Sequence, residues 1–142
     1  MGNSYGAEAA GDAILLAARI CLVLLFLIFG WQKLTSFGGT VAYFSHTGVP
    51  LPQIAAAVAV TMEFFVGLAI ALGFFTRPLA LLLALYTLAT AIIGHHFWSL
   101  SGSAQFENEI NFFKNVSIIG GLLLLYVAGA GRFSVDHKIR SA

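Results

Sequence analysis

Four long apolar runs dominate the chain and are separated by short polar segments. They cover approximately residues 13–34, 51–73, 78–97 and 110–130. About 20 helical residues are needed to cross a hydrocarbon core about 30 Å thick, so each run predicts a membrane-spanning helix. The sequence therefore predicts an all-α polytopic membrane protein, an antiparallel bundle of four transmembrane helices with both ends on one side. This domain covers residues 13–131, between a polar N-terminal segment (1–12) and a short basic C-terminal tail (132–142).

Polar and helix-breaking residues mark the predicted boundaries. Lys33 ends the first run at headgroup level, and the Ser-Phe-Gly-Gly stretch at 36–39 is not expected to hold a helix. The very short turn at 73–78 forces an antiparallel hairpin, with Pro78 at the first position of the third helix. The polar stretch at 99–109 is expected to form the loop before the fourth helix.

Composition supports a membrane protein and excludes other classes. Hydrophobic residues make up 59% of the chain and charged residues 9%, whereas about a quarter of a soluble domain is charged. A net charge of +1 lacks the basic footprint of a nucleic-acid binder. With one cysteine, Cys21, neither an intramolecular disulfide nor a CxxC pair can form. The sequence has no HxxxH, HExxH or CxxC spacing, so we predict no metal site.

The distribution of basic residues predicts an orientation. Positive residues resist translocation, so they gather on the cytoplasmic side of a bacterial inner membrane. Four lie at the side of the chain ends, Arg77, Arg132, Lys138 and Arg140, whereas the opposite side has Lys33, with Lys114 close by. We therefore expect both termini in the cytoplasm.

Three charged residues lie away from the ends of the apolar runs: Arg19, Glu63 and Lys114. A charge at the centre of the bilayer costs roughly 2.5–3.5 kcal/mol on insertion scales, so each of them needs a compensating interaction. Arg19, Phe26 and Lys33 repeat at seven residues and share one helix face. We expect that face to point inward.

Small residues give the other helices a face for close packing. These faces are Ala55, Ala59, Glu63, Gly67 and Ala71 in the second helix, Ala84, Thr87, Ala91, His95 and Trp98 in the third, and Lys114, Ser117 and Gly121 in the fourth. Packed together, they would bring Glu63 within reach of Arg19 or Lys114. Two interpretations stay open: a buried ion pair that fixes helix register, or a polar cavity that binds a quinone-like head group, a small ligand or a proton.

The chain resembles the DoxX family of small bacterial membrane proteins. The resemblance rests on Arg19 followed by Phe29-Gly30-Trp31-Gln32-Lys33, on Glu63 followed by Gly67 and then Leu72-Gly73-Phe74-Phe75-Thr76-Arg77, and on the pair Lys114-Asn115. It implies a four-helix membrane protein that is an oxidoreductase or a subunit of one, with relatives linked to quinone reduction. The family's polar residues fall on Arg19, Lys33, Glu63, Arg77, His95 or His96, and Lys114.

These observations define a candidate site and three candidate functions. The ligand-binding candidates are Arg19, Lys33, Glu63, His95 and Lys114, with Glu63 as the candidate catalytic residue. The favoured function is an accessory or quinone-facing subunit of a membrane redox complex, in contact with lipid and a protein partner and compatible with a homo-oligomer. The alternatives are an autonomous quinone-linked oxidoreductase, with Glu63 as proton acceptor, and a small carrier or permeability factor. No covalently bound cofactor is predicted, and quinone is the candidate ligand.

Overall fold

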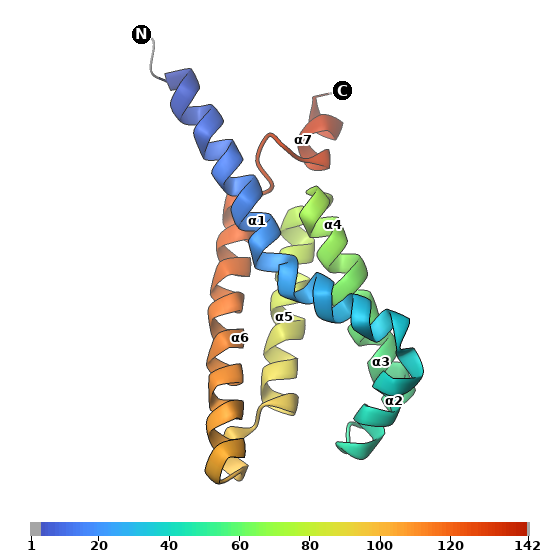
Figure 1. Cartoon of the computed structure of the whole chain (residues 1–142). Coiled ribbons are helices and arrows are strands. Elements are labelled where there is room, and N and C mark those ends of the chain that lie inside the picture. The colour runs from blue at the N-terminus through green and yellow to red at the C-terminus, as the bar shows by residue number, and fades with distance from the viewer. Residues whose placement is uncertain (1–3, 142) are drawn as a thin grey trace.

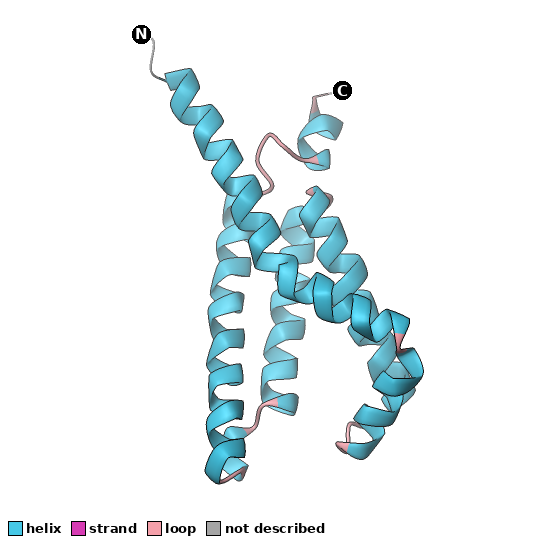
Figure 2. Cartoon of the chain, viewed as in Figure 1, coloured by secondary structure: helices cyan, strands magenta, loops and turns pink. Residues whose placement is uncertain are grey.

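The computed structural model describes the backbone of residues 4–141 and the side chains of residues 10–141. All regular elements in this part of the chain are helices, joined by short loops (Figure 2). They are α1 (Ser4–Thr35), α2 (Phe37–His46), α3 (Pro52–Val60), the π-helix η1 (Thr61–Val66), α4 (Gly67–Leu72), α5 (Thr76–Gly94), the 3-10 turn η2 (Phe97–Ser99), α6 (Gly102–Ala128) and α7 (Val135–Arg140). The elements α3, η1 and α4 follow one another without a break and form one long helix.

Four stretches of the described chain are long and apolar enough to cross a membrane. They are Ala10–Thr35, Pro52–Leu72, Thr76–Ser99 and Gly102–Ala128. Successive spans run in opposite directions, and the described chain begins and ends at the same end of the molecule (Figure 1). The protein is therefore an all-α polytopic membrane protein, which confirms the predicted fold class.

The four spans pack as two pairs. Helix α5 packs most extensively against α6, whereas α1 crosses obliquely over the long helix formed by α3, η1 and α4 (Figure 1). The pairs meet through α4 and η1 on α5 and through α1 on α6. The core at this junction includes Val23, Phe26, Met62, Ile70, Leu83 and Leu122.

Glycine allows the closest approach between α1 and η1. A Cβ atom on Gly30 would lie 2.5 Å from the backbone nitrogen of Phe64, closer than real Cβ contacts. Small residues are what let membrane helices come this near to one another. The predicted stripe in the second span is confirmed at its centre, where Ala59, Glu63 and Gly67 are buried, whereas Ala55 and Ala71 at its ends are half-buried.

Three expectations about boundaries are wrong. The stretch at 36–39 does not end helical structure, because α2 begins at Phe37 and the N–H of Thr40 donates to the carbonyl of Ser36. The polar stretch at 99–109 is no long loop either, since α6 begins at Gly102. Thr76, not Pro78, is the first residue of α5. Near a bilayer, leaving a peptide group without a hydrogen bond costs more free energy than placing a glycine or a polar residue in a helix. The chain therefore stays helical through both stretches.

Candidate functional site

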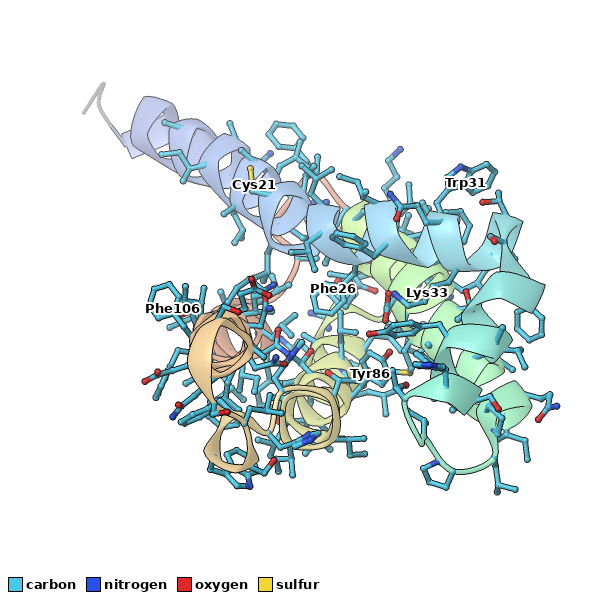
Figure 3. All side chains as sticks on the ribbon, turned by 60° about the horizontal axis from the view of Figure 1, so that its bottom comes forward. Cys21, Phe26, Trp31, Lys33, Tyr86 and Phe106 are labelled. Atoms are coloured by element: carbon cyan, nitrogen blue, oxygen red, sulfur yellow. The ribbon has the colours of Figure 1, made fainter. Side chains whose placement is uncertain are left out.

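The Glu63 carboxylate joins three spans inside the bundle. Lys33 Nζ from α1 donates to Glu63 Oε2 at 2.7 Å, and the Tyr86 hydroxyl from α5 donates to Oε1 at 2.7 Å. Figure 3 shows the Lys33 and Tyr86 side chains pointing toward each other from opposite sides of this junction. We call these three residues the Glu63 cluster. Both carboxylate oxygens have a partner, one ammonium and one phenol.

The backbone around Glu63 departs from the α-helix. Glu63 lies in η1, where the backbone makes π-type instead of α-type hydrogen bonds, and regular α-helix continues on either side. Single π-turns inside α-helices are rare and often occur at functional sites. The wider turn places a carboxylate at the point where α1 and α5 both contact the long helix.

The cluster is shielded but retains access on the Lys33 side. The Glu63 side chain is 12% exposed and that of Lys33 is 24% exposed. The ammonium also lies 5.7 Å from the centre of the Phe29 ring, a distance suited to a cation–π interaction. An ammonium has three N–H donors, and Glu63 takes one of them. Lys33 can therefore donate further hydrogen bonds to a ligand that reaches it.

Arg19 is not the partner of Glu63, which corrects one expectation. Its guanidinium donates to the backbone carbonyls of Ala71 at 3.2 Å and Phe133 at 2.8 Å, and also to that of Ala130. Arg19 is 1% exposed, so its inward position is confirmed. However, it lies about 21 Å from Lys33 along α1 at the helical rise of 1.5 Å per residue. The two cations therefore serve different ends of the helix.

Lys114 is the second incorrect partner. It is exposed and donates to Asn111 Oδ1 at 2.7 Å on its own helix. The expected inward face of α6 is thus wrong at Lys114 and Ser117, because the buried residues of that helix include Asn115, Leu122 and Leu125. An exposed lysine can extend its ammonium to the headgroup region, which removes the need for a buried partner.

His95 also lies apart from the Glu63 cluster. It follows the end of α5, and its Nδ1 lies 3.2 Å from Asn108 Oδ1 of α6. Of the five predicted ligand-binding residues, the structure brings together only Lys33 and Glu63. Within the described residues, no three His, Cys, Asp or Glu side chains converge in a way that could hold a metal ion.

Tyr86 is not among the site residues predicted from the sequence, and the pairing of Lys33 with Glu63 is not predicted either. Tyr86 precedes Thr87, which belongs to the predicted inward face. A tyrosine within an apolar span could have indicated this site, because a buried tyrosine hydroxyl usually has a hydrogen-bond partner. Lys33 is among the predicted ligand-binding residues, but the sequence predicts Arg19 or Lys114, and not Lys33, as the partner of Glu63. Because α1 crosses η1 obliquely, its last turn still contacts the interior.

A second polar region lies at the end of the molecule that carries the chain ends. Asp136 of α7 accepts hydrogen bonds from the N–H groups of Phe75 and Thr76, at 2.8 and 2.9 Å, and so ties α7 to the start of α5. Burial raises the pKa of this carboxyl, but those two donors and the charge of Arg140 outweigh burial. The pKa of Asp136 therefore lies below its ordinary value. Arg77, also expected from the resemblance, is exposed beside this contact.

Fold and site together define a polytopic α-helical membrane protein with a carboxylate–ammonium–phenol cluster between its spans. The chain belongs to the DoxX family, whose model matches residues 14–96. It is 52% identical to the inner membrane protein YphA of Escherichia coli, over 92% of this chain and 93% of that protein. It is 41% identical to the inner membrane protein YqjF of the same organism, over 90% of this chain and 93% of that protein.

The chain is also similar, more distantly, to part of a longer yeast protein. The ER-derived vesicles protein ERV29 of Saccharomyces cerevisiae is 29% identical over 96% of this chain but only 36% of its own length. No solved structure matches the chain.

Proposed function

We propose that this protein is a quinone-facing subunit of a membrane redox complex in the bacterial inner membrane, with both termini in the cytoplasm. The observation that carries the proposal is the Glu63 cluster, a hydrogen-bonded carboxylate, ammonium and phenol within membrane-spanning helices. Ionisable groups at this depth are costly and mark ligand or proton pathways. The family membership and the inner-membrane names of two relatives support the location.

The chemistry of the cluster suits a quinone head group. A quinone has two carbonyl oxygens that accept hydrogen bonds, and its reduction to a quinol takes up two electrons and two protons. The spare N–H donors of Lys33 would hold one carbonyl and stabilise the negative charge that builds there. Glu63 would exchange the proton, and Tyr86 would orient the carboxylate. In this proposal the electrons come from a partner subunit.

An apolar groove beside the cluster suits the isoprenoid tail. It has a volume of about 430 Å³ and runs along α3 and η1. Its lining residues are Gln53, Ile54, Ala57, Val58, Thr61 and Met62. None of the three cluster residues lines this groove; in the proposal the head group lies where the groove ends at Met62, one residue from Glu63.

Tryptophan fluorescence offers a direct test. The Trp31 ring contacts that of Phe64, the residue after Glu63, with ring centres 5.5 Å apart, whereas Trp98 lies in η2. Quinones quench nearby tryptophans, so we expect saturable quenching by ubiquinone of a W98F variant in nanodiscs. A W31F variant, which keeps only Trp98, should show the unsaturable quenching of diffusing quinone.

Substitutions in the cluster separate binding from a purely structural role. We expect Lys33→Met to weaken saturable quenching about tenfold, because a charge-assisted hydrogen bond is lost. Lys114→Met is the matched control and should change nothing, since Lys114 is exposed and donates to Asn111 of its own helix instead of Glu63. If Lys33→Met lowers thermal stability but leaves the quenching as in the wild type, the cluster only fixes helix register, and the proposal is refuted. Quinone reduction by the purified chain with a chemical donor would instead favour the autonomous enzyme.

A further inference from the structure

A polar cavity lies at the end of the molecule that carries the chain ends, far from the Glu63 cluster. It has a volume of about 260 Å³ and is walled by the loop after α6. Its charged and titratable lining residues come from α1, α5, α7 and this loop: Asp12, Arg77, Arg132, Asp136, His137 and Arg140. The proposed quinone function uses none of them.

The two acidic residues in this cavity are already engaged by the chain. Asp12 accepts a hydrogen bond from the backbone N–H of Arg132 at 3.0 Å and lies 3.8 Å from its Nε atom. Asp136 accepts the two N–H groups at the start of α5. Among the side chains of residues 10–141, neither Arg77 nor Arg140 forms an ion pair within 4.0 Å. The cavity therefore presents an excess of positive charge.

The cavity lies at the depth of lipid headgroups. Arg77 is the second residue of α5, whose span begins at Thr76, and the span of α6 ends at Ala128, just before the Gly129 that lines the cavity. Gly129 has a positive φ of 81°, and a Cβ there would come within 3.2 Å of Arg77 Nε. The glycine therefore leaves room for the guanidinium at the edge of the bilayer.

An apolar surface adjoins the two arginines. A neighbouring cavity of about 300 Å³ shares Arg77, Asp136 and Arg140 with the first. It adds the exposed side chains of Phe75 and Ile139. Guanidinium groups beside apolar side chains match a phospholipid, whose phosphate lies directly above its acyl chains.

We propose that this cavity binds the phosphate of an anionic phospholipid headgroup, with Arg77 and Arg140 as its ligands. Arginine presents paired N–H donors that fit two phosphate oxygens at once. A bound phosphate would neutralise the excess charge of the cavity and bridge α5 to α7. This inference is independent of the proposed quinone function, because it rests on other residues at the other end of α1.

Native mass spectrometry of the full chain released from nanodiscs tests this proposal. With mixed phosphatidylcholine and phosphatidylglycerol, we expect the wild type to retain phosphatidylglycerol. Arg77→Gln and Arg140→Gln should each lower this retention about tenfold, as a charge-assisted contact is lost. Lys138→Gln is the matched control: it removes one charge from the same helix as Arg140, but Lys138 lines neither cavity, so retention should fall clearly less than in either arginine variant.

Two results would overturn the proposal. An equal loss in Lys138→Gln and Arg140→Gln would mean that diffuse surface charge, and no defined site, retains the lipid. Inorganic phosphate would be the ligand if it binds the protein in nanodiscs of phosphatidylcholine alone, with dependence on Arg77 and Arg140, and also displaces phosphatidylglycerol in the mixed nanodiscs. If Arg77→Gln does not fold, Arg140→Gln carries the test, since Arg140 is exposed on α7. Phosphatidylglycerol should then raise the melting temperature of the wild type but not that of Arg140→Gln.

Discussion

Helix α1 carries two cations on its inward face, and the structure uses them in opposite ways. Arg19 is fully buried and donates only to backbone carbonyls, at the end of α4 and in the segment after α6. Lys33 is partly exposed and pairs with a carboxylate that also binds a phenol. The first arrangement ties chain segments together, whereas the second leaves groups that can exchange a proton or bind a ligand.

This difference teaches what to ask of an intramembrane charge. Carbonyls at a helix C-terminus lack intrahelical partners and carry partial negative charge, so a guanidinium can satisfy several of them without a counter-ion. Arg19 uses four of its five N–H donors on backbone carbonyls and is almost completely buried, so little of it is left for a ligand. A lysine with one carboxylate keeps free donors, so it is the better candidate for function.

Removal of Arg19 should have the largest effect and would break the comparison most directly. Arg19→Met leaves the carbonyls of Ala71, Ala130 and Phe133 without their donor. Unsatisfied buried acceptors cost about 1–3 kcal/mol each, so we expect a loss of about 3–5 kcal/mol, measured by unfolding in mixed micelles. Arg19→Lys should recover only part, because one ammonium cannot reach all three carbonyls. A loss below that of Lys33→Met would contradict the assigned roles.

An added methyl group at Gly30 should have the next largest effect on stability, and it tests the Lys33 end of α1. The Cβ of a Gly30→Ala variant would overlap the backbone of Phe64, so α1 must move away from η1. Overpacking of this kind costs about 1–3 kcal/mol, and the Lys33–Glu63 pair should lengthen as α1 shifts. Unfolding in micelles measures the loss. Gly120→Ala is the control, since nothing lies within 4 Å of its Cβ, and unchanged stability in both variants would refute the close contact.

The sequence predicted the fold well because lipid imposes a simple rule. Four runs of sufficient length and hydropathy predicted four spans, since only helices satisfy their backbone within a bilayer. Helical periodicity also predicted the inward position of Arg19, Phe26 and Glu63. The partner of Glu63 was not predictable in this way. Periodicity gives the face of a helix, whereas a partner depends on depth and crossing angle, which α1 sets by its oblique path.

The π-helix and α2 show a second limit. Thr61–Val66 forms a π-helix where an α-helix was expected, and α2 forms a helix where none was expected. The six residues Thr61–Val66 contain no glycine or proline that would indicate the π-helix. Tertiary contacts, here α1 and α5 on η1, decide such departures. Of the three cluster residues, Glu63 lies in such a departure, as is expected of strained or functional sites, whereas Lys33 and Tyr86 lie in regular α-helices.

A double-mutant cycle on Lys33 and Glu63 should give a smaller effect. Hydrogen bonds between membrane helices average about 0.6 kcal/mol and reach about 1.7 kcal/mol, so we expect a coupling of about 1 kcal/mol between Lys33→Met and Glu63→Gln. Unfolding of the two single variants and the double variant in micelles measures it. The same cycle on Lys114 and Glu63 should give no coupling, because Lys114 donates to Asn111. Equal coupling energies in both cycles would mean that Glu63 responds to a diffuse electrostatic field, and that Lys33 is not its specific partner.

The contact that holds α7 near Arg19 should give the smallest effect, and it should depend on pH. Asp136→Ala removes the acceptor for two N–H groups at the start of α5, at a cost of about 1 kcal/mol, as for other helix caps. Because the folded pKa of Asp136 lies below the ordinary 3.8, its stabilisation is complete above that value and is lost as the pH falls through the folded pKa. The difference in melting temperature between wild type and Asp136→Ala should therefore be full near neutral pH and shrink in acid. Asp136→Asn keeps an acceptor without a charge, so its stability should change little with pH relative to Asp136→Ala. If the melting temperature of the wild type still exceeds that of Asp136→Ala in strong acid, the charge of the Asp136 carboxylate contributes nothing to stability. At this end of the molecule, the charged contact that holds the chain segments together would then be that of Arg19 with the backbone carbonyls.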